Sequence, residues 1–293
     1  MNAPPPAKMN LNLPPAIVYP SPHMPELPEV ETVRTGLSEI FERQPLIVRA
    51  RLLRADIRFA VPPDLPARLE GQRVVAVRRR GKYLLIETPR VILLSHLGMT
   101  GSWRVVKEED KHDHLYLELD DGRRLAFRDP RRFGLLDLIE TGRESEHPRL
   151  RALGPEPFDP AFGADYLRNR ARGRLPSVKA FLMDGRTVVG VGNIYASEIL
   201  FRAGVRPQRR AGRVTASEWG RIAESVRSVL REAIAAGGSS IRDYLGADGE
   251  PGGFQKSFSV YGRERQPCPA CAAPVREKAL GGRSSFYCAV CQK

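Results

Sequence analysis

The spacing of apolar residues predicts a helix that begins near residue 25, a β-rich stretch after it, and helices in the second half of the chain. Apolar residues first recur at spacings of three and four, the period of one helical face: Val30, Val33, Leu37, Ile40 and Phe41. Pro28 falls in the expected first turn, where a missing N–H is tolerated. Glu29 and Glu31 lie near the N-terminus of this helix, where carboxylates are favoured by the helix dipole.

Four short apolar runs between residues 73 and 119 predict strands. They are RVVAV at 73–77, YLLIE at 83–87, VILLSHL at 91–97 and HLYLEL at 114–119. The last run alternates, turns at Asp120-Asp121-Gly122 and resumes in RRLAF, a pattern typical of a β-hairpin. We therefore expect a β-sandwich or barrel as far as about residue 140.

Helical spacing returns after LGPEPFDPAFG, a stretch rich in Pro and Gly at 153–163 that we interpret as a linker. Thr215 and Glu218 fit a capping box at the start of a helix. The apolar residues that follow line one face, and Gly237-Gly238 would end the helix. They are Trp219, Ile222, Val226, Val229, Leu230, Ala233 and Ile234.

These patterns predict an α+β protein with several domains. We expect a disordered Pro-rich extension at 1–24, a β-sandwich domain with flanking helices at 25–152, the linker at 153–163, a helical domain at 164–262 and a cysteine-bearing module at 263–293. Within the helical domain, the Gly-rich and polar stretch after residue 238 is expected to form a loop. No internal repeat is evident.

The four cysteines form two CxxC pairs in the last 26 residues, Cys268/Cys271 and Cys288/Cys291. Paired CxxC turns suit four thiolates around a tetrahedral, closed zinc site, so we expect one structural Zn²⁺. Four unrelated thiols or a redox pair are the alternatives. A secreted disulfide framework would spread its cysteines more widely, so a reducing cytoplasm is the expected location.

The charge balance favours a polyanion as partner. Lys and Arg total 47 against 34 Asp and Glu, a formal net charge of +13, and neutralising phosphates releases counterions. A merely soluble basic protein is the alternative. No run of about 18 apolar residues is present, so we expect no membrane-spanning helix.

Met24-Pro25-Glu26 is the clearest sign of chemistry. Residues 1–23 hold seven prolines and resemble no signal peptide, and Met24 is a plausible alternative start. If Met24 is trimmed, Pro25 presents a secondary amine that can attack an electrophilic carbon and form an iminium. Glu26 and Glu29 could then move protons. An ordinary acidic helix start explains the same residues without chemistry.

A second motif and the tail suggest contacts with phosphates. Asn193 follows Gly190-Val191-Gly192 and opens a predicted helix, so the free N–H groups of that turn could hold a phosphate. Asn193 could equally be a plain N-cap. In the tail, Arg276, Lys278 and Arg283 lie beside Phe286 and Tyr287, as in a phosphate-contacting finger or a solvated charged surface.

From Met24 to Lys293 the chain resembles the formamidopyrimidine-DNA glycosylases of the Fpg/Nei superfamily. The matching segments occur in the family's order: PELPEVETVRTGL, RRRGKYLLIE, SHLGMTGSWRV, KHDHLYLEL, RDPRRFG, LGPEPF, FLMD, VVGVGNIYASEILFRAGVRP, VYGRERQPCPAC and RSSFYCAVCQK. The resemblance implies an N-terminal catalytic β-sandwich, a helix–two-turn–helix domain and a C-terminal zinc-finger β-hairpin. It also implies a base-excision-repair glycosylase and AP lyase, monomeric, acting on double-stranded DNA with oxidised purines.

The resemblance also assigns roles to single residues. Pro25 matches the nucleophile that forms a Schiff base with the deoxyribose, Glu26 the proton donor, and Glu29 a supporting carboxylate. Lys82, in the RGKYLL segment that we expect to be a strand, matches a lysine that supports the elimination chemistry. Arg283 matches a residue that acts at the catalytic site.

Other matched positions concern the DNA. Met99, Arg131 and Phe133 match the residues that fill the gap left by the extruded nucleotide, although Met and Phe alone would more often be core residues. Asn193 and Arg283 match a phosphate clamp. His112 and Arg174 match further DNA contacts, and the loop at 239–254 matches the one that closes over the damaged base.

The 23 residues before Pro25 depart from the family, because an amide nitrogen has no lone pair with which to form the iminium. We interpret them as a mis-called start. Proteolytic trimming and a non-catalytic protein that binds damaged DNA are the alternatives. A third reading is the endonuclease VIII-like branch, which acts on pyrimidines, although PELPEVE favours the purine branch.

Overall fold

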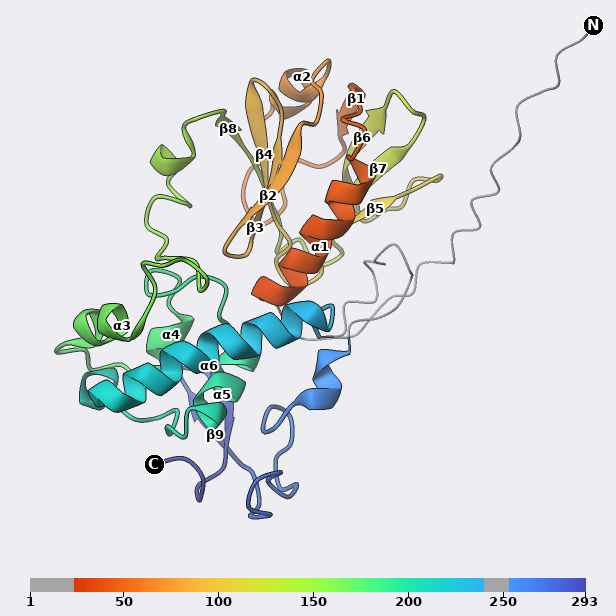
Figure 1. The fold of residues 1–293 in the computed structure, drawn as a ribbon. Helices are drawn as coiled ribbons and strands as arrows, with labels where there is room; N and C mark the ends of the chain where they lie inside the picture. Colours follow the sequence, from red (N-terminus) through yellow and green to blue (C-terminus); the bar gives the residue numbers. More distant parts are fainter. Residues whose placement is uncertain (1–23, 240–252) are drawn as a thin grey trace, which may run out of the picture.

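Two four-stranded antiparallel sheets make up most of the first half of the chain (Figure 1). The structure is a computed structural model, and it describes residues 24–239 and 253–293. One sheet has the order β1-β6-β7-β5 and the other β2-β3-β4-β8. The strands are β1 (Ile47–Leu52), β2 (Ala76–Arg80), β3 (Tyr83–Glu87), β4 (Val91–His96), β5 (Ser102–Val105), β6 (Asp113–Leu119), β7 (Arg124–Arg128) and β8 (Leu135–Glu140).

The two sheets share one apolar core, as expected for a sandwich. Leu84, Ile86 and Leu93 from one sheet belong to the same buried cluster as Leu117 and Phe127 from the other. Alternate residues of the β2-β3-β4-β8 sheet face the opposite side and form a smaller cluster. The predicted β-sandwich is therefore confirmed.

The first hairpin of the sandwich differs from the prediction. The strand expected at 73–77 begins later, since β2 spans Ala76–Arg80. It pairs with β3, and the pair nearest to the connecting turn is Arg80 with Tyr83. That register leaves Gly81 and Lys82 as a two-residue turn, with Gly81 at φ 59° as such turns require. Lys82 therefore lies at the tip of a hairpin and not in a strand, which frees its side chain to point away from the sheet.

The first helix joins the two halves of the molecule. Helix α1 (Leu27–Ile40) follows the predicted face, with Val30, Val33 and Leu37 buried in the core of the sandwich. Leu27, in its first turn, instead belongs to the core of the helical half. Figure 1 shows α1 running from beside α6 to the sheets, so the N-terminus of α1 lies at the junction of the halves.

Helices form the second half, in which no helix or strand occurs between residues 147 and 163. Thr215 and Glu218 form the predicted capping box at the start of the longest helix, and its predicted apolar face is buried apart from the half-buried Ile234. The helices are α3 (Ala164–Ala171), α4 (Val178–Met183), α5 (Asn193–Arg202) and α6 (Ala216–Ala235), with α2 (Leu65–Leu69) in the first half. Three short 3₁₀ helices lie at Glu144–Glu146, Ala211–Arg213 and Phe254–Ser257.

The chain ends in a small hairpin that docks on the helical half. Strands β9 (Arg276–Leu280) and β10 (Arg283–Tyr287) are joined by Gly281 and Gly282, both at positive φ. Gln292 Nε2 donates to Val205 O at 2.8 Å, and the backbone N–H of Arg206 donates to Lys293 O at 2.9 Å. These bonds fix the tail against the turn that follows α5.

None of the helices in the described ranges is long and apolar enough to cross a membrane. The predicted extension at 1–24 lies outside the described residues except for Met24, and so does most of the predicted capping loop at 239–254.

Candidate active site

The carboxyl group of Glu26 is held at the N-terminus of α5. It is 2% exposed and accepts hydrogen bonds from the backbone N–H groups of Gly192 at 2.5 Å, Ile194 at 2.8 Å and Tyr195 at 3.4 Å. A side chain at position 192 would place its Cβ 2.4 Å from Glu26 Cδ. The predicted Gly-rich turn therefore holds a carboxylate of this chain, and only a glycine leaves room for it.

Burial raises the pKa of Glu26 to about 7. The nearby positive charge of Lys82 opposes this rise in pKa, and the negative charge of Glu29 adds to it. Near neutral pH the group therefore exchanges its proton readily, which is the property that a general acid needs.

Glu29 is the second buried carboxylate, and it fixes the backbone on which Glu26 stands. It accepts hydrogen bonds from the Glu26 N–H at 2.9 Å, from Tyr195 Oη at 2.6 Å, and from the N–H and Oγ of Ser239, both at 2.8 Å. Tyr195 stays a donor because burial, followed by the charge of Glu29, raises its pKa well above the usual value. Glu29 thus ties α1 to α5 and to Ser239, which lies four residues beyond the end of α6.

Lys82 approaches both carboxylates from the tip of the β2–β3 hairpin. Burial lowers its pKa, the charges of Glu26 and Glu29 oppose that shift, and Arg283 adds to it. These mutual effects place Lys82 near Glu26 and Glu29, although it comes from a turn and not from the expected strand, and its role in the elimination stays a prediction.

Pro25 directly precedes Glu26, and both lie ahead of the first turn of α1. Pro25 is half-buried, whereas Glu26 is buried. The predicted nucleophile and the predicted proton donor are thus held side by side at the junction of the two halves.

Lys179, in α4, is a site residue that the sequence did not reveal. It is 2% exposed, and its Nζ donates to Ser284 O and to Ser285 Oγ, both at 2.9 Å. Burial lowers its pKa to about 8, Glu26 opposes the shift and Arg283 adds to it. Lys179 therefore links the charge of Glu26 with the hairpin that carries Arg283. A lysine on an otherwise apolar helix face was the only signal.

The predicted gap-filling residues lie on two neighbouring turns of the sandwich. Met99 is half-buried between β4 and β5, while Arg131 and Phe133 are exposed between β7 and β8. The Arg131 guanidinium carbon lies 4.9 Å from the centre of the Phe133 ring, which is 39% exposed. An exposed aromatic ring beneath an arginine is available to a partner and is not part of the core.

His96 lies at the base of the Met99 turn and was not predicted. Its Nδ1 accepts a hydrogen bond from the Gly98 N–H at 2.9 Å. Burial, followed by the charge of Lys82, lowers the pKa of His96 to about 4. The ring is therefore neutral near pH 7, as an Nδ1 acceptor must be.

Asn193 is the first residue of α5, and Gly192 before it is the N-cap. Its Nδ2 donates to Tyr261 Oη at 3.4 Å, while its Oδ1 is buried without a hydrogen-bond partner in the described part of the chain. Since the two amide atoms can exchange places by a flip, Asn193 has an unused polar atom for a ligand. Glu198 holds the segment with Tyr261 by accepting from three successive N–H groups at 2.8–3.0 Å.

The three remaining DNA-contact predictions fall on the surface. Arg283, the first residue of β10, is exposed yet close enough to lower the pKa of Lys82 and Lys179. His112 is half-buried before β6, and its carbonyl accepts from the Asp129 N–H at 3.0 Å. Arg174 is exposed between α3 and α4, and within the described part of the chain no hydrogen bond or ion pair joins its side chain to Glu26 or Glu29.

The four cysteines gather in one group, and all their Sγ atoms lie within 4.8 Å of one another. The Sγ atoms of Cys268 and Cys291 are 3.8 Å apart, and those of Cys271 and Cys288 are 3.5 Å apart. A tetrahedron with Zn–S bonds of about 2.3 Å has edges of about 3.8 Å. The donor set and its spacing fit one structural zinc ion.

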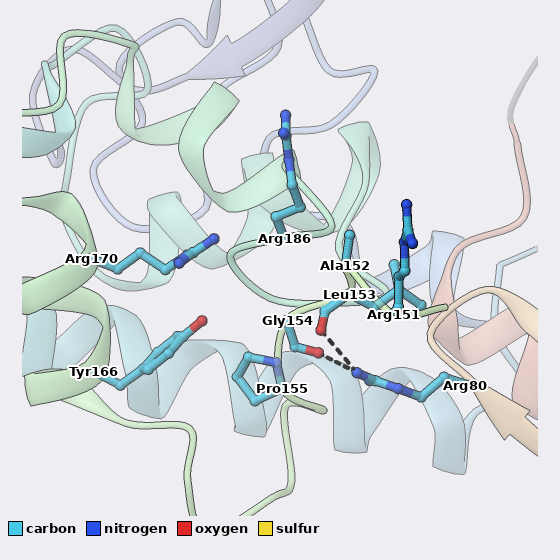
Figure 2. A pocket seen from close by; sticks show the side chains of 9 residues that line it. All are labelled: Arg80, Arg151, Ala152, Leu153, Gly154, Pro155, Tyr166, Arg170 and Arg186. Carbon is cyan, nitrogen blue, oxygen red and sulfur yellow. Dashed lines mark hydrogen bonds between the residues drawn. The ribbon is translucent and has the colours of Figure 1, made fainter. Parts of the chain in front are cut away.

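A hollow of about 450 Å³ is lined in part by Leu153, Gly154 and Pro155 of the linker (Figure 2). Its wall includes Arg80, Arg151, Arg170 and Arg186. Arg80 donates to Gly154 O at 2.6 Å, so its charge also fastens the linker to the β2–β3 hairpin. None of the predicted catalytic residues lines the hollow, so it is separate from the site around Glu26.

Three family models match the chain in sequence order. They describe the formamidopyrimidine-DNA glycosylase N-terminal domain at residues 24–136, the formamidopyrimidine-DNA glycosylase H2TH domain at 153–244, and a zinc finger found in FPG and IleRS at 265–293. Together they span most of the sequence.

Whole proteins give the same result. The chain is 51% identical over 284 residues to the formamidopyrimidine-DNA glycosylase of Paracoccus denitrificans, and 47% identical over 272 residues to that of Bdellovibrio bacteriovorus. Each match covers 92% of this chain and 100% of the relative.

Solved structures agree as well. A crystal structure of the MutM (Fpg) protein of Thermus thermophilus superposes with a TM-score of 0.82 at 42% identity, covering 92% of this chain and 98% of that one. A Lactococcus lactis Fpg mutant in complex with DNA that contains Fapy-dG superposes with a TM-score of 0.83 at 32% identity, covering 92% and 100%.

Proposed function

The chain belongs to the formamidopyrimidine-DNA glycosylase family, and from that premise we propose that it excises oxidised purines from double-stranded DNA and then cuts the strand as an AP lyase. The observation that carries the proposal is the buried Glu26 carboxyl group. It lies directly after Pro25, at a helix N-terminus, with a pKa of about 7. A carboxyl group of ordinary pKa could not serve as a proton donor at neutral pH.

The proposed reaction begins at the Pro25 nitrogen. Its lone pair attacks C1′ of the extruded nucleotide, the bond from C1′ to the damaged base breaks, and the departing base takes up the proton that the Pro25 nitrogen loses. Glu26 then donates its proton to the ring oxygen of the sugar, the bond between C1′ and that oxygen opens, and an iminium forms between C1′ and Pro25.

Elimination follows from this Schiff base. Loss of a proton from C2′ expels the 3′ phosphate, a second elimination expels the 5′ phosphate, and water then hydrolyses the iminium to release Pro25. Lys82 is suited to assist, because burial lowers its pKa and its ammonium group gives up a proton more readily than that of a solvated lysine. The result is a strand with a one-nucleotide gap.

The mechanism requires that Pro25 be a free N-terminus, and we propose that the working protein begins there. The N-terminal family model matches from residue 24, one position before Pro25. An initiator methionine followed by a small residue such as Pro25 is readily removed. Pro25 would then be an amine just ahead of a helix N-terminus, where the dipole disfavours its protonated form.

The remaining site residues are proposed to hold the DNA. Asn193, with its unused polar atom, and the exposed Arg283 would clamp the phosphates beside the extruded nucleotide. His112 and Arg174 would contact the backbone further along. The three gap-filling residues would occupy the space left in the duplex. One structural zinc ion would keep the finger folded, and a monomer in the cytoplasm is expected to suffice.

Borohydride trapping tests this proposal directly. One protein would begin at Met24, so that removal of the methionine exposes Pro25, and the other would keep residues 1–23. The first should be captured covalently on a duplex with 8-oxoguanine opposite cytosine, and the second should not. Capture of neither protein would support a lesion-binding protein without activity, and a preference for thymine glycol duplexes would place the chain in the pyrimidine branch.

A further inference from the structure

Two turns of the sandwich are joined through the carboxyl group of Asp129. The first turn, residues 97–101, carries Met99, and the second, residues 129–134, carries the other two gap-filling residues. One Asp129 oxygen accepts a hydrogen bond from Thr100 Oγ1 at 2.5 Å, and the other accepts from the Gly134 N–H at 2.6 Å. Asp129 is fully buried, so neither bond is shared with solvent.

The Thr100 hydroxyl group completes the link between the turns. It donates to Asp129 and accepts a hydrogen bond from the Arg131 N–H at 3.2 Å. The residue next to Met99 thus holds the backbone of Arg131 directly. Asp129 is itself anchored below, because its carbonyl oxygen lies 2.8 Å from Nε2 of the buried His114.

Close backbone packing leaves the turns no room to slide past each other. A Cβ on Gly98 would lie 2.3 Å from the Phe133 carbonyl carbon, and one on Gly134 would lie 3.1 Å from the carbonyl oxygen of His96, just before the first turn. The two turns are therefore in contact along their main chains as well as through Thr100.

We propose that Thr100 and Asp129 are positioning residues, which lock Met99, Arg131 and Phe133 into one preassembled wedge. This inference rests on the proposed function, because it concerns how the enzyme extrudes a nucleotide. A wedge that is already rigid loses little further conformational entropy when it enters the base stack. The free energy of DNA binding is therefore not weakened by the cost of ordering the three side chains. The wedge then acts as a unit, although its side chains come from separate turns.

Thr100→Val tests the lock, with Thr100→Ser as the matched control. Valine keeps the shape and removes the hydroxyl group, whereas serine restores the hydroxyl group alone. Single-turnover excision of 8-oxoguanine opposite cytosine should fall about tenfold in Thr100→Val, the scale of a lost pair of hydrogen bonds, and stay within about twofold in Thr100→Ser. Incision of a preformed abasic site should fall no more than about twofold, because no base has to be extruded there.

The outcomes separate this proposal from the proposed function. If the unaltered protein beginning at Pro25 cuts neither duplex, the proposed function fails before the lock is tested. If the unaltered protein is active and Thr100→Val excises 8-oxoguanine as fast as the unaltered protein does, the lock is refuted. The lock is also refuted if Thr100→Val and Thr100→Ser lose excision and abasic-site incision to the same extent.

A double-mutant cycle supplies a second readout. When Thr100 is present, the effects of Met99→Ala and Phe133→Ala on the activation free energy of excision should not add up in the double variant, because the two side chains act as one rigid unit. In the Thr100→Val background the two effects should become additive. Equal coupling in both backgrounds would overturn the proposal.

Discussion

The Glu26 cluster, which consists of Glu26, Glu29 and Lys82, and the cysteine finger at residues 265–293 are both essential to the proposed function. Different forces hold the two regions together. The cluster lies where two apolar cores meet, and its carboxylates are fixed by backbone N–H groups at the start of α5 and beyond the end of α6. In the finger, β9 is exposed along most of its length and contributes little to a core. Apolar burial can place the first site without a metal, whereas the second needs its zinc ion.

Zinc removal should show the largest difference between the two regions. Structural zinc contributes about 10–16 kcal/mol in zinc-finger peptides, whereas the finger adds only a few buried residues, among them Val275 and Phe286, to the helical core, so chelation should unfold residues 265–293. The two apolar cores should stay folded, which amide hydrogen exchange can follow by region. DNA affinity should collapse and should return when zinc is added back. Protected finger amides in the metal-free protein would contradict the comparison.

Glu26→Gln should act mainly on the chemistry. Removing a general acid typically costs about a hundredfold or more in rate, so excision should fall by at least that factor while DNA binding stays close to that of the unaltered protein. Stopped-flow excision and equilibrium binding on one duplex would check both. A variant that loses binding and excision in parallel would mean that Glu26 is a structural residue.

The same variant should change the pH dependence of stability. Glu26 ionises near pH 4.5 when unfolded and near pH 7 when folded, so unaltered protein loses stability as the pH rises between these values, by about 3 kcal/mol in full. Glu26→Gln should lack this loss. Its melting temperature relative to the unaltered protein should therefore increase from pH 5 to pH 8, and a pH-independent difference would show that the pKa of Glu26 is not raised.

Lys179→Met should weaken the link between the Glu26 cluster and the cysteine finger, with a smaller effect on function than Glu26→Gln. The variant removes two hydrogen bonds to the finger and the charge between Glu26 and Arg283. We expect DNA affinity to fall about tenfold, on the scale of hydrogen bonds from a charged donor, with the zinc content unchanged. Lys107→Met, at an exposed position, controls for the lost charge. Equal effects of the two substitutions would mean that only net charge matters.

Arg283→Ala should have the smallest effect, limited to one phosphate contact. The slope of log affinity against log salt should become shallower by about one, and Arg283→Lys should restore most of it. Fluorescence anisotropy over a salt series measures both. An unchanged slope would exclude Arg283 from the phosphate clamp.

Local patterns were enough to predict the features that neighbouring residues determine. The apolar face of α1, the capping box of α6 and the two CxxC pairs all lie within short stretches of sequence, and the structure confirms them. Strand β2 was placed too early because VVAV has a higher β propensity than VRRR, whereas the register is set by the turn at Gly81 and Lys82.

Features that depend on distant residues could not be predicted. β1 was missed because the arginines in IVRARL hide its two buried positions, and β5 because it has only four residues. Lys179 gains its role from Ser284 and Ser285, more than 100 residues away. The pairing of Thr100 with Asp129 likewise arises only when two separate turns come together in the sandwich.

The most direct test of the account is to locate the covalent bond itself. Protein that begins at Pro25 would be trapped with borohydride on a duplex containing 8-oxoguanine, digested with protease and nuclease, and sequenced by mass spectrometry. We predict that the sugar remnant is attached to the N-terminal nitrogen of Pro25. A remnant on Lys82, Lys179 or another amine, or efficient trapping of protein in which Pro25 is still an amide, would contradict the account.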